Sequence, residues 1–328
     1  MAMQPSSPRR TLTGEFAKDK LFRILSLDGG GAKGFYTLGV LKEIEGMLGC
    51  PLYQCFDLIF GTSTGSIIGS LIALGYEIDE IHGLYRKYVP DVMKPARKHA
   101  RSVALAKLAR DVFGSATFED VKTGIGVVAT KWIIEKPIIF KGSVRQAHGR
   151  AATFVPGFGV PIGKAVQASC SAYPFFLRQK LKMPGGDKLE VVDGGYCANN
   201  PSLYAIADAV AALGKSDEDI RLVSVGVGVY PEPKGRWYWR VVRKYLLSVR
   251  LLQKTMEINP QSMEQLREVL FRKIKTVRIS DSFNQPEMAT DFMEYNLAKL
   301  DVLWQRGRDS FASRETVLRE YLIPSGGS

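Results

Sequence analysis

Apolar stretches of strand length alternate with amphipathic stretches of helix length along most of the chain. The first long helical stretch places leucine or isoleucine at positions 38, 41, 44 and 48, so one face of that helix should be buried. The alternation predicts a mostly parallel sheet covered by helices, which is an α/β fold. The expected elements are strand 24–27, helix 33–48, strand 58–60, helix 64–74, strand 189–192, helix 203–213 and strand 222–227.

The end of the chain continues this alternation. The predicted elements there are helix 260–271, strand 274–279 and helix 291–304, the last with Phe292, Tyr295, Leu300 and Leu303 on its apolar positions.

At 328 residues the chain has the size of one large α/β enzyme domain. We expect a single catalytic domain over 21–323, with a C-terminal helical extension from about 252. Residues 1–20 contain prolines and scattered charges but no apolar core, which predicts a flexible tail and no secretion signal. A second tail is expected over 324–328.

The uncharged stretch 58–76 has the length of a membrane span. Its glycines and serines would make a weak span, however, and a central strand followed by a buried helix explains the same apolarity. We therefore predict a strand and a helix here.

A G-x-S-x-G pattern joins the predicted strand 58–60 to the helix that follows. In a nucleophile elbow the chain turns sharply from strand to helix, and the glycines two residues either side of the serine let neighbouring backbones pass. This context predicts Ser63 as an exposed nucleophile, with Gly61 and Gly65 supporting the turn.

A glycine-rich loop, 28–34, follows the first predicted strand and opens the first helix. Consecutive backbone N–H groups at the start of a helix carry partial positive charge and can hold an oxyanion. Gly34 would support this loop. The predicted oxyanion hole comprises N–H groups of Gly29, Gly30, Gly31 and Thr64.

Asp193 directly follows the predicted strand 189–192, and Gly194 and Gly195, which come next, would support the turn there. A carboxylate at the end of a strand, beside flexible backbone, is a candidate general base for Ser63. An ordinary aspartate has a pKa near about 3.9 and is a poor base at neutral pH, so partial burial should raise its pKa.

These three blocks, in this order, resemble the patatin-like phospholipases over roughly 22–229. The segments 168–174 and 199–201 are similar to further blocks of that family. The resemblance implies a three-layer α/β/α fold and a Ser63–Asp193 dyad that cleaves acyl esters of phospholipids. Lys33 stands where the family usually carries arginine, which keeps the charge but loses bidentate hydrogen bonding.

The histidine content favours a dyad independently of the family. The chain has three histidines, His82, His99 and His148, and all of them precede Asp193. A triad in the order serine, acid, histidine would need His148 with an acid such as Asp111 or Asp120. Solvent-facing histidines in polar stretches are the expectation preferred here.

Dinucleotide binding is the main alternative for the glycine loop, because its glycines fit G-x-G-x-x-G after a strand. Asp28 would set negative charge near a pyrophosphate, however, and no acid follows a second strand at the required distance. Phe35 stands where a phosphate-binding P-loop needs lysine. A non-enzymatic dinucleotide-binding protein is therefore the disfavoured alternative.

Cys50, Cys55, Cys170 and Cys197 form no C-x-x-C pair, and no histidine lies at metal-ligand spacing from them. We expect no metal site and no other cofactor. Nothing in the pattern demands a disulfide, so a reducing cytoplasm is the default compartment.

Basic residues outnumber acidic ones by 45 to 33, and the net charge is +12. The pattern over 236–254 is typical of a basic amphipathic helix on an anionic membrane, although a helix docked on protein with a solvated basic face explains it too. Nucleic acid would attract this charge, but no nucleic-acid module is recognisable, so no nucleic-acid partner is expected. The basic residues are concentrated at Lys94, Arg97, Lys98, Arg101, Lys107 and Arg110, and at Arg236, Arg240, Arg243, Lys244, Arg250 and Lys254.

The C-terminal region is similar to that of bacterial patatin-like effectors that cyclic nucleotides switch on in anti-phage defence. The similarity lies at Thr290, Asp291, Asn296, Leu297, Leu300, Gly307, Arg308, Ser310 and Phe311. It implies a cyclic dinucleotide activator, and the basic surfaces could receive that ligand or form a homo-oligomer.

The favoured prediction is a cytoplasmic lipid acyl hydrolase that acts peripherally on phospholipid at the inner membrane. A soluble esterase or thioesterase with the same dyad stays open as an alternative.

Overall fold

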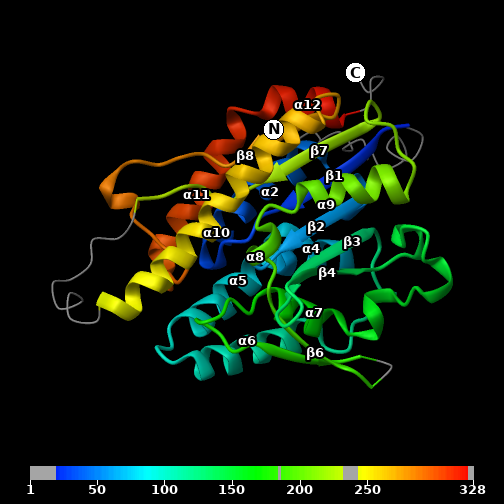
Figure 1. The fold of residues 1–328 in the computed structure, drawn as a ribbon. Coiled ribbons are helices and arrows are strands. Elements are labelled where there is room, and N and C mark those ends of the chain that lie inside the picture. The colour runs from blue at the N-terminus through cyan, green and yellow to red at the C-terminus, as the bar shows by residue number, and fades with distance from the viewer. Residues whose placement is uncertain (1–19, 184–185, 232–242, 324–328) are drawn as a thin grey trace, which may run out of the picture.

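The computed structural model describes residues 20–183, 186–231 and 243–323 (Figure 1). Its centre is an eight-stranded sheet in the order β5-β6-β3-β2-β1-β7-β8, with β4 paired to β3 off this path. The strands are β1 Phe22–Leu27, β2 Leu58–Thr62, β3 Gly124–Lys131, β4 Lys136–Lys141, β5 Gln179–Lys182, β6 Lys188–Asp193, β7 Ile220–Val225 and β8 Lys275–Ile279.

The sheet is parallel at its centre, because β3, β2, β1, β7 and β8 pair in parallel. Antiparallel pairing occurs only between β3 and β4, between β3 and β6, and between β5 and β6 within the described residues. All six residues of β1 are buried, as expected for a strand with helices on both faces.

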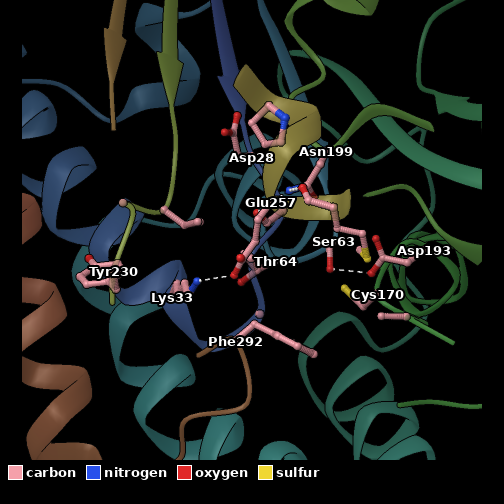
Figure 2. A pocket seen from close by; sticks show the side chains of 18 of the residues that line it. Asp28, Lys33, Ser63, Thr64, Cys170, Asp193, Asn199, Tyr230, Glu257 and Phe292 are labelled. Atoms are coloured by element: carbon pink, nitrogen blue, oxygen red, sulfur yellow. Dashed lines mark hydrogen bonds and ion pairs between the residues drawn. The ribbon is translucent and has the colours of Figure 1, made fainter. Parts of the chain in front are cut away.

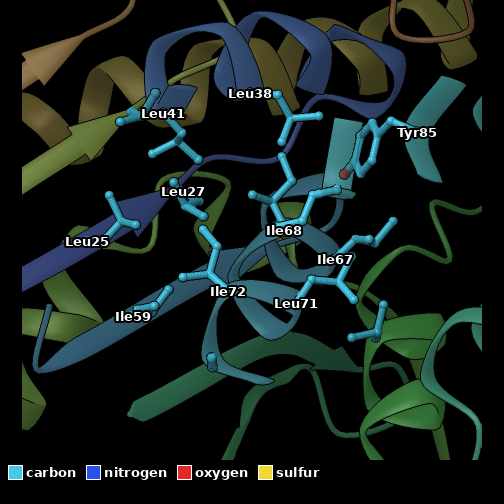
Figure 3. Packing of buried hydrophobic residues seen from close by; sticks show 14 of the residues in the cluster. Leu25, Leu27, Leu38, Leu41, Ile59, Ile67, Ile68, Leu71, Ile72 and Tyr85 are labelled. Atoms are coloured by element: carbon cyan, nitrogen blue, oxygen red, sulfur yellow. The ribbon is translucent and has the colours of Figure 1, made fainter. Parts of the chain in front are cut away.

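Alternate residues of β1 pack into two different hydrophobic clusters. Leu25 and Leu27 contact the cluster that contains α2 (Gly34–Leu48) and α4 (Thr64–Leu74), shown in Figure 3. Phe22 and Ile24 belong to the cluster on the other face, with α8 (Gly195–Ala198) and α9 (Ser202–Ala207). Because successive strand residues point to opposite faces, this division defines three layers and confirms the predicted α/β/α fold.

The other helices cover the edges of these layers. They are α3 Leu52–Cys55, α5 Ile78–Met93, α6 Lys98–Phe113, α7 Ile162–Ser169, α10 Arg243–Leu270, α11 Leu297–Ala312 and α12 Glu315–Leu322, with short 3-10 turns and a π-helical turn at Asp208–Ala212 between them. Within the described residues, none of the helices is long and apolar enough to cross a membrane. The stretch 58–76 divides into β2 and α4, as predicted.

The C-terminal region packs directly on the sheet and its helices. Strand β8 pairs with β7, and α11 crosses α2 where both helices carry glycine. A Cβ on Gly39 would lie 2.1 Å from the carbonyl oxygen of Trp304, and a Cβ on Gly307 would lie 2.0 Å from that of Tyr36. Only glycine therefore allows these two backbones to approach so closely.

Two helices begin more than one residue away from their predicted starts. The helix predicted over 260–271 is the end of the longer α10, which continues through Pro260 although an interior proline removes one helical hydrogen bond and crowds the preceding turn. The helix predicted over 291–304 begins at Leu297, because the Asn296 side chain accepts hydrogen bonds from the next N–H groups and caps it there. Tyr295 is consequently exposed, whereas Leu300 is buried.

The basic segment 236–254 is described only in part. Arg236 and Arg240, with the aromatic residues between them, lie outside the described residues, and α10 begins at Arg243. The expected amphipathic helix on a membrane therefore stays a prediction.

The sequence pattern did not demand a disulfide, but the structure contains one. It joins Cys50 to Cys55, the last residue of the single-turn helix α3. Cys170 and Cys197 are free thiols.

Candidate active site

The turn at Ser63 has the backbone geometry of a nucleophile elbow. Ser63 has φ 52° and ψ −122°, a conformation that non-glycine residues rarely adopt. Its N–H donates to Ser169 Oγ at 2.9 Å, at the end of α7. A Cβ on Gly65 would lie 2.2 Å from the carbonyl oxygen of Leu27, and one on Gly61 would lie 2.3 Å from that of Gly65. Both glycines are thus required for β2, β1 and α4 to meet here.

Strand β3 brings Ser63 and Asp193 together from distant parts of the chain. On this strand Val128 pairs with Thr62 of β2, and the next residue, Ala129, pairs with Asp193 of β6. Strand β3 has two edges, and β4 pairs along one of them. Both β2 and β6 therefore pair along the opposite edge, one after the other. The residue after Thr62 and the last residue of β6 therefore face each other across a short gap.

The two predicted reacting groups are hydrogen-bonded. Ser63 Oγ donates to Asp193 Oδ2 at 2.7 Å (Figure 2). The N–H of Gly195 donates to Asp193 Oδ1 at 2.7 Å. Asp193 is fully buried. Burial raises the pKa of its carboxyl group to about 7, although the two hydrogen bonds act in the opposite direction. A carboxylate with this pKa can accept a proton at neutral pH.

The glycine loop provides backbone donors beside Ser63, but not from every residue that was predicted. The N–H of Gly29 donates to the carbonyl oxygen of Asn199 at 2.9 Å, so it is not available to an oxyanion in this structure. In the described part of the chain, the N–H groups of Gly30, Gly31 and Thr64 have no acceptor. These three can still form the predicted oxyanion hole.

Gly29 is required for a different reason, because there is no room for a side chain at this position. A Cβ at this position would lie 2.2 Å from Asn199 Oδ1 and 3.1 Å from Ser63 Cβ. Gly31 has φ 58°, in the left-handed region, and packs against the carbonyl oxygen of Phe292.

The remaining predicted support glycines also lie in close contacts. Replacement by alanine would place each new Cβ against a neighbour: at Gly34, 2.5 Å from Thr64 Oγ1; at Gly194, 2.3 Å from the carbonyl oxygen of Val128; and at Gly195, 2.5 Å from Met256 Cε.

Two ion pairs that the sequence did not reveal hold the ends of the glycine loop. The Arg278 guanidinium, from β8, donates to both oxygens of Asp28, with Nη1 to Oδ1 at 2.9 Å. Burial raises the pKa of Asp28, and Arg278 opposes that rise. At the other end of the loop, Lys33 Nζ lies 3.1 Å from Glu257 Oε1 of α10 and its side chain is buried (Figure 2).

A cavity of about 550 Å³ opens beside Ser63. The Ser63 hydroxyl and the Asp193 carboxylate line it together with the glycine loop, whereas most of its wall is apolar, and α10 lines it through Met256, Glu257 and Ile258. The cavity can therefore hold a long apolar group with its polar end at Ser63. The apolar wall includes Ile67, Val89, Val92, Met93, Leu105, Leu108, Phe175, Phe176 and Phe292.

None of the three histidines lines this cavity. His148 pairs with Asp208, at 2.6 Å between Nε2 and Oδ1, and not with Asp111 or Asp120 as a triad would require. His99 is exposed as predicted. The same prediction is wrong for His82, whose ring stacks on Trp304 at 3.9 Å.

Across the described residues, no three His, Cys, Asp or Glu side chains gather as a metal site would need.

The sequence model of the family described as "Patatin-like phospholipase" matches residues 25–206, which include the elbow, the glycine loop and Asp193. The chain belongs to the patatin-like phospholipase family. This confirms the resemblance drawn from the three sequence blocks.

Relatives of this patatin-like phospholipase include two enzymes named for cyclic nucleotide activation. The chain is 63% identical to the cUMP-AMP-activated phospholipase of Escherichia coli, over 97% of this chain and 98% of that protein. It is 27% identical to the cGAMP-activated phospholipase of Vibrio cholerae, over 62% of this chain and 63% of that protein. It is also 30% identical to human calcium-independent phospholipase A2-gamma, over 65% of this chain and 29% of that protein.

Proposed function

We propose that this phospholipase hydrolyses acyl esters of membrane phospholipids with Ser63 as nucleophile and Asp193 as general base. Ser63 Oγ attacks the ester carbonyl carbon while its proton passes to Asp193 Oδ2. The N–H groups of Gly30, Gly31 and Thr64 stabilise the negative oxygen of the tetrahedral intermediate. The intermediate then releases the lysophospholipid oxygen, which takes the proton from Asp193 and leaves an acyl ester on Ser63.

Water completes the reaction by the same route in reverse. Asp193 accepts a proton from water, the hydroxide attacks the acyl ester, and Ser63 recovers its proton as the fatty acid leaves. The observation that carries this proposal is the 2.7 Å hydrogen bond from Ser63 to a buried carboxylate, at the polar end of an apolar cavity. A single acyl chain fits that combination of a reactive end and an apolar wall.

The proposal includes activation by a cyclic dinucleotide. Its support is the 63% identity, over nearly the whole of both chains, to an enzyme named for activation by cUMP-AMP. We propose that the same class of ligand activates this chain, and that the active enzyme works peripherally on the inner membrane of the cell.

Hydrolysis of phospholipid vesicles, measured as released fatty acid, tests the proposal. The protein is assayed with cUMP-AMP, with cGAMP and without nucleotide, alongside Ser63→Ala. We expect nucleotide-dependent release by the parent protein and none by Ser63→Ala, and labelling of the parent protein at Ser63 by a fluorophosphonate. Cleavage of soluble short-chain esters without cleavage of vesicles would instead identify a soluble esterase. Full activity of Ser63→Ala would refute the dyad.

A further inference from the structure

The turn between β3 and β4 exposes a group of apolar side chains. Trp132, Ile133 and Ile134 are 36%, 73% and 52% exposed. They occupy three of the four positions between Lys131, which ends β3, and Lys136, which begins β4. A contiguous group of exposed apolar side chains can mark a site that contacts another protein or a membrane, and its position on the molecule decides which.

This hairpin tip lies at the same edge of the sheet as the active site. Strand β3 runs parallel to β2, so both strands end at the edge where Ser63 lies. Trp132 follows Ala129, the residue paired with Asp193, by three positions. At about 3.3 Å per residue, Trp132 lies about 10 Å beyond the level of Asp193, and the rest of the tip follows it.

Aromatic residues and cations surround the base of the tip. The Trp132 ring lies 5.7 Å from the Tyr173 ring and 6.3 Å from the Tyr196 ring. The Arg178 guanidinium stacks on both Trp132 and Tyr173, at 5.3 Å and 5.4 Å, and Lys98 lies 5.6 Å from the Tyr173 ring. Tryptophan, tyrosine and basic side chains together are typical of protein surfaces at the boundary between lipid headgroups and acyl chains.

The two hairpins at this edge also oppose like charges. Lys131 pairs directly with Lys136 across β3 and β4, and Lys182 pairs with Lys188 across β5 and β6. Directly opposed like charges destabilise a sheet, and an anionic surface would relieve the repulsion. The acidic residues near these lysines are Glu135, Asp187 and Glu190, of which Glu190 pairs with Arg178 at 3.1 Å.

We propose that the β3–β4 hairpin tip, residues 132–135, inserts into an anionic phospholipid surface and docks the active-site edge of the protein on it. The inference rests on the proposed function, because it supplies the docking surface for a membrane substrate. Ile133 and Ile134 enter the boundary of the acyl chains, Trp132 lies among the headgroups, and the flanking lysines contact phosphate.

The test compares two variants that each remove a pair of exposed apolar residues. Ile133→Ser with Ile134→Ser changes the tip. Val269→Ser with Leu270→Ser changes residues of α10 that are 62% and 63% exposed, and serves as the matched control. Binding to vesicles is measured by co-sedimentation, with and without phosphatidylglycerol, and with and without cUMP-AMP. Turnover of a soluble short-chain ester is measured in parallel and reports an intact active site.

We expect the tip variant to bind phosphatidylglycerol vesicles on the order of 10- to 100-fold more weakly than the parent, while the control variant binds like the parent. Lys136→Ala with Lys182→Ala should weaken binding about 30-fold at low salt and less at high salt. Bromine on the lipid acyl chains should quench tryptophan fluorescence in the parent, and less so in Trp132→Phe.

The proposal would be overturned if the tip variant binds vesicles as well as the parent does. It would also be overturned if the tip variant keeps its vesicle binding but changes its oligomeric state. Failure of the parent to bind vesicles under every condition would overturn it too. If the parent binds through the tip but releases no fatty acid with any nucleotide, the proposed function fails and the docking surface stands. If vesicle hydrolysis is present and the tip variant retains it fully, only the docking proposal fails.

Discussion

Replacing Asp193 with asparagine should stabilise the protein while it abolishes catalysis. Burial raises the pKa of Asp193 from 3.8 to about 7, so the folded state holds its proton more tightly than the unfolded state does. Below about pH 4 Asp193 is protonated in both the folded and the unfolded state, and the free energy of unfolding is not lowered. Between about pH 4 and pH 7 the unfolded state alone ionises, and the free energy of unfolding falls by about 1.4 kcal/mol per pH unit. Above about pH 7 the loss levels off at about 4 kcal/mol.

Asparagine avoids this loss because it has nearly the same shape and stays neutral. Its amide oxygen can still accept from the N–H of Gly195, and its amide nitrogen can donate to Ser63 Oγ. The stability of Asp193→Asn relative to the parent should therefore increase by about 3 kcal/mol between about pH 5 and pH 8.

Urea unfolding at both pH values, followed by circular dichroism, measures this difference. Other titrating groups are common to both proteins and cancel in the comparison. Ser63→Ala is the control, because it is equally inactive in ester cleavage but keeps the buried carboxyl group and should keep the pH trend of the parent. A stability difference that is the same at both pH values, or an Asp193→Asn protein that is less stable at pH 8, would refute the reasoning.

Four further outcomes are expected. The kcat/KM for a soluble ester should rise with pH through about 7, the pKa of Asp193, and then level off, as a pH–rate profile would show. Gly29→Ala should lower kcat about 100-fold or more by displacing Asn199 and crowding Ser63, whereas Gly46→Ala, with nothing within 4 Å of the added Cβ, should leave kcat unchanged. Arg278→Leu should lower the free energy of unfolding by about 3–5 kcal/mol, because it leaves a buried carboxylate unpaired, and neutralising that carboxylate as well should recover part of the loss in urea unfolding. His148→Ala should retain soluble-ester turnover within about twofold. A loss of turnover as large as that expected for a catalytic group would instead support a histidine triad.

Local signals in the sequence predicted the elements next to the active site. Helix α4 covers 64–74 as expected, because the G-x-S-x-G pattern marks the boundary between strand and helix. The start of α11 was predicted six residues too early, since apolar spacing does not distinguish a capped turn from the first turn of a helix. Asn296 is the residue whose side chain could have located this boundary.

Such local signals could not reveal the contacts between segments that are distant in the sequence. The partners of Asp28 and Lys33 are Arg278 and Glu257, which come from a strand and a helix more than 200 residues away. A charged residue in an amphipathic pattern gives no sign of the charge that it will meet. The exclusion of Gly29 from the oxyanion hole likewise depends on where the backbone of Asn199 passes.

The shared edge of β3 has a consequence for how the protein can vary. Ser63 and Asp193 are 130 residues apart in the chain, yet two consecutive residues of β3 position them. Val128 pairs with the residue before Ser63, and Ala129 pairs with Asp193. Lengthening or shortening loops that do not contact the active site would leave the spacing of these two side chains unchanged. Adding one residue within the strand would turn the aspartate to the other side of the sheet. Loops far from the active site can thus vary in length, whereas the paired residues of β3 tolerate no insertion.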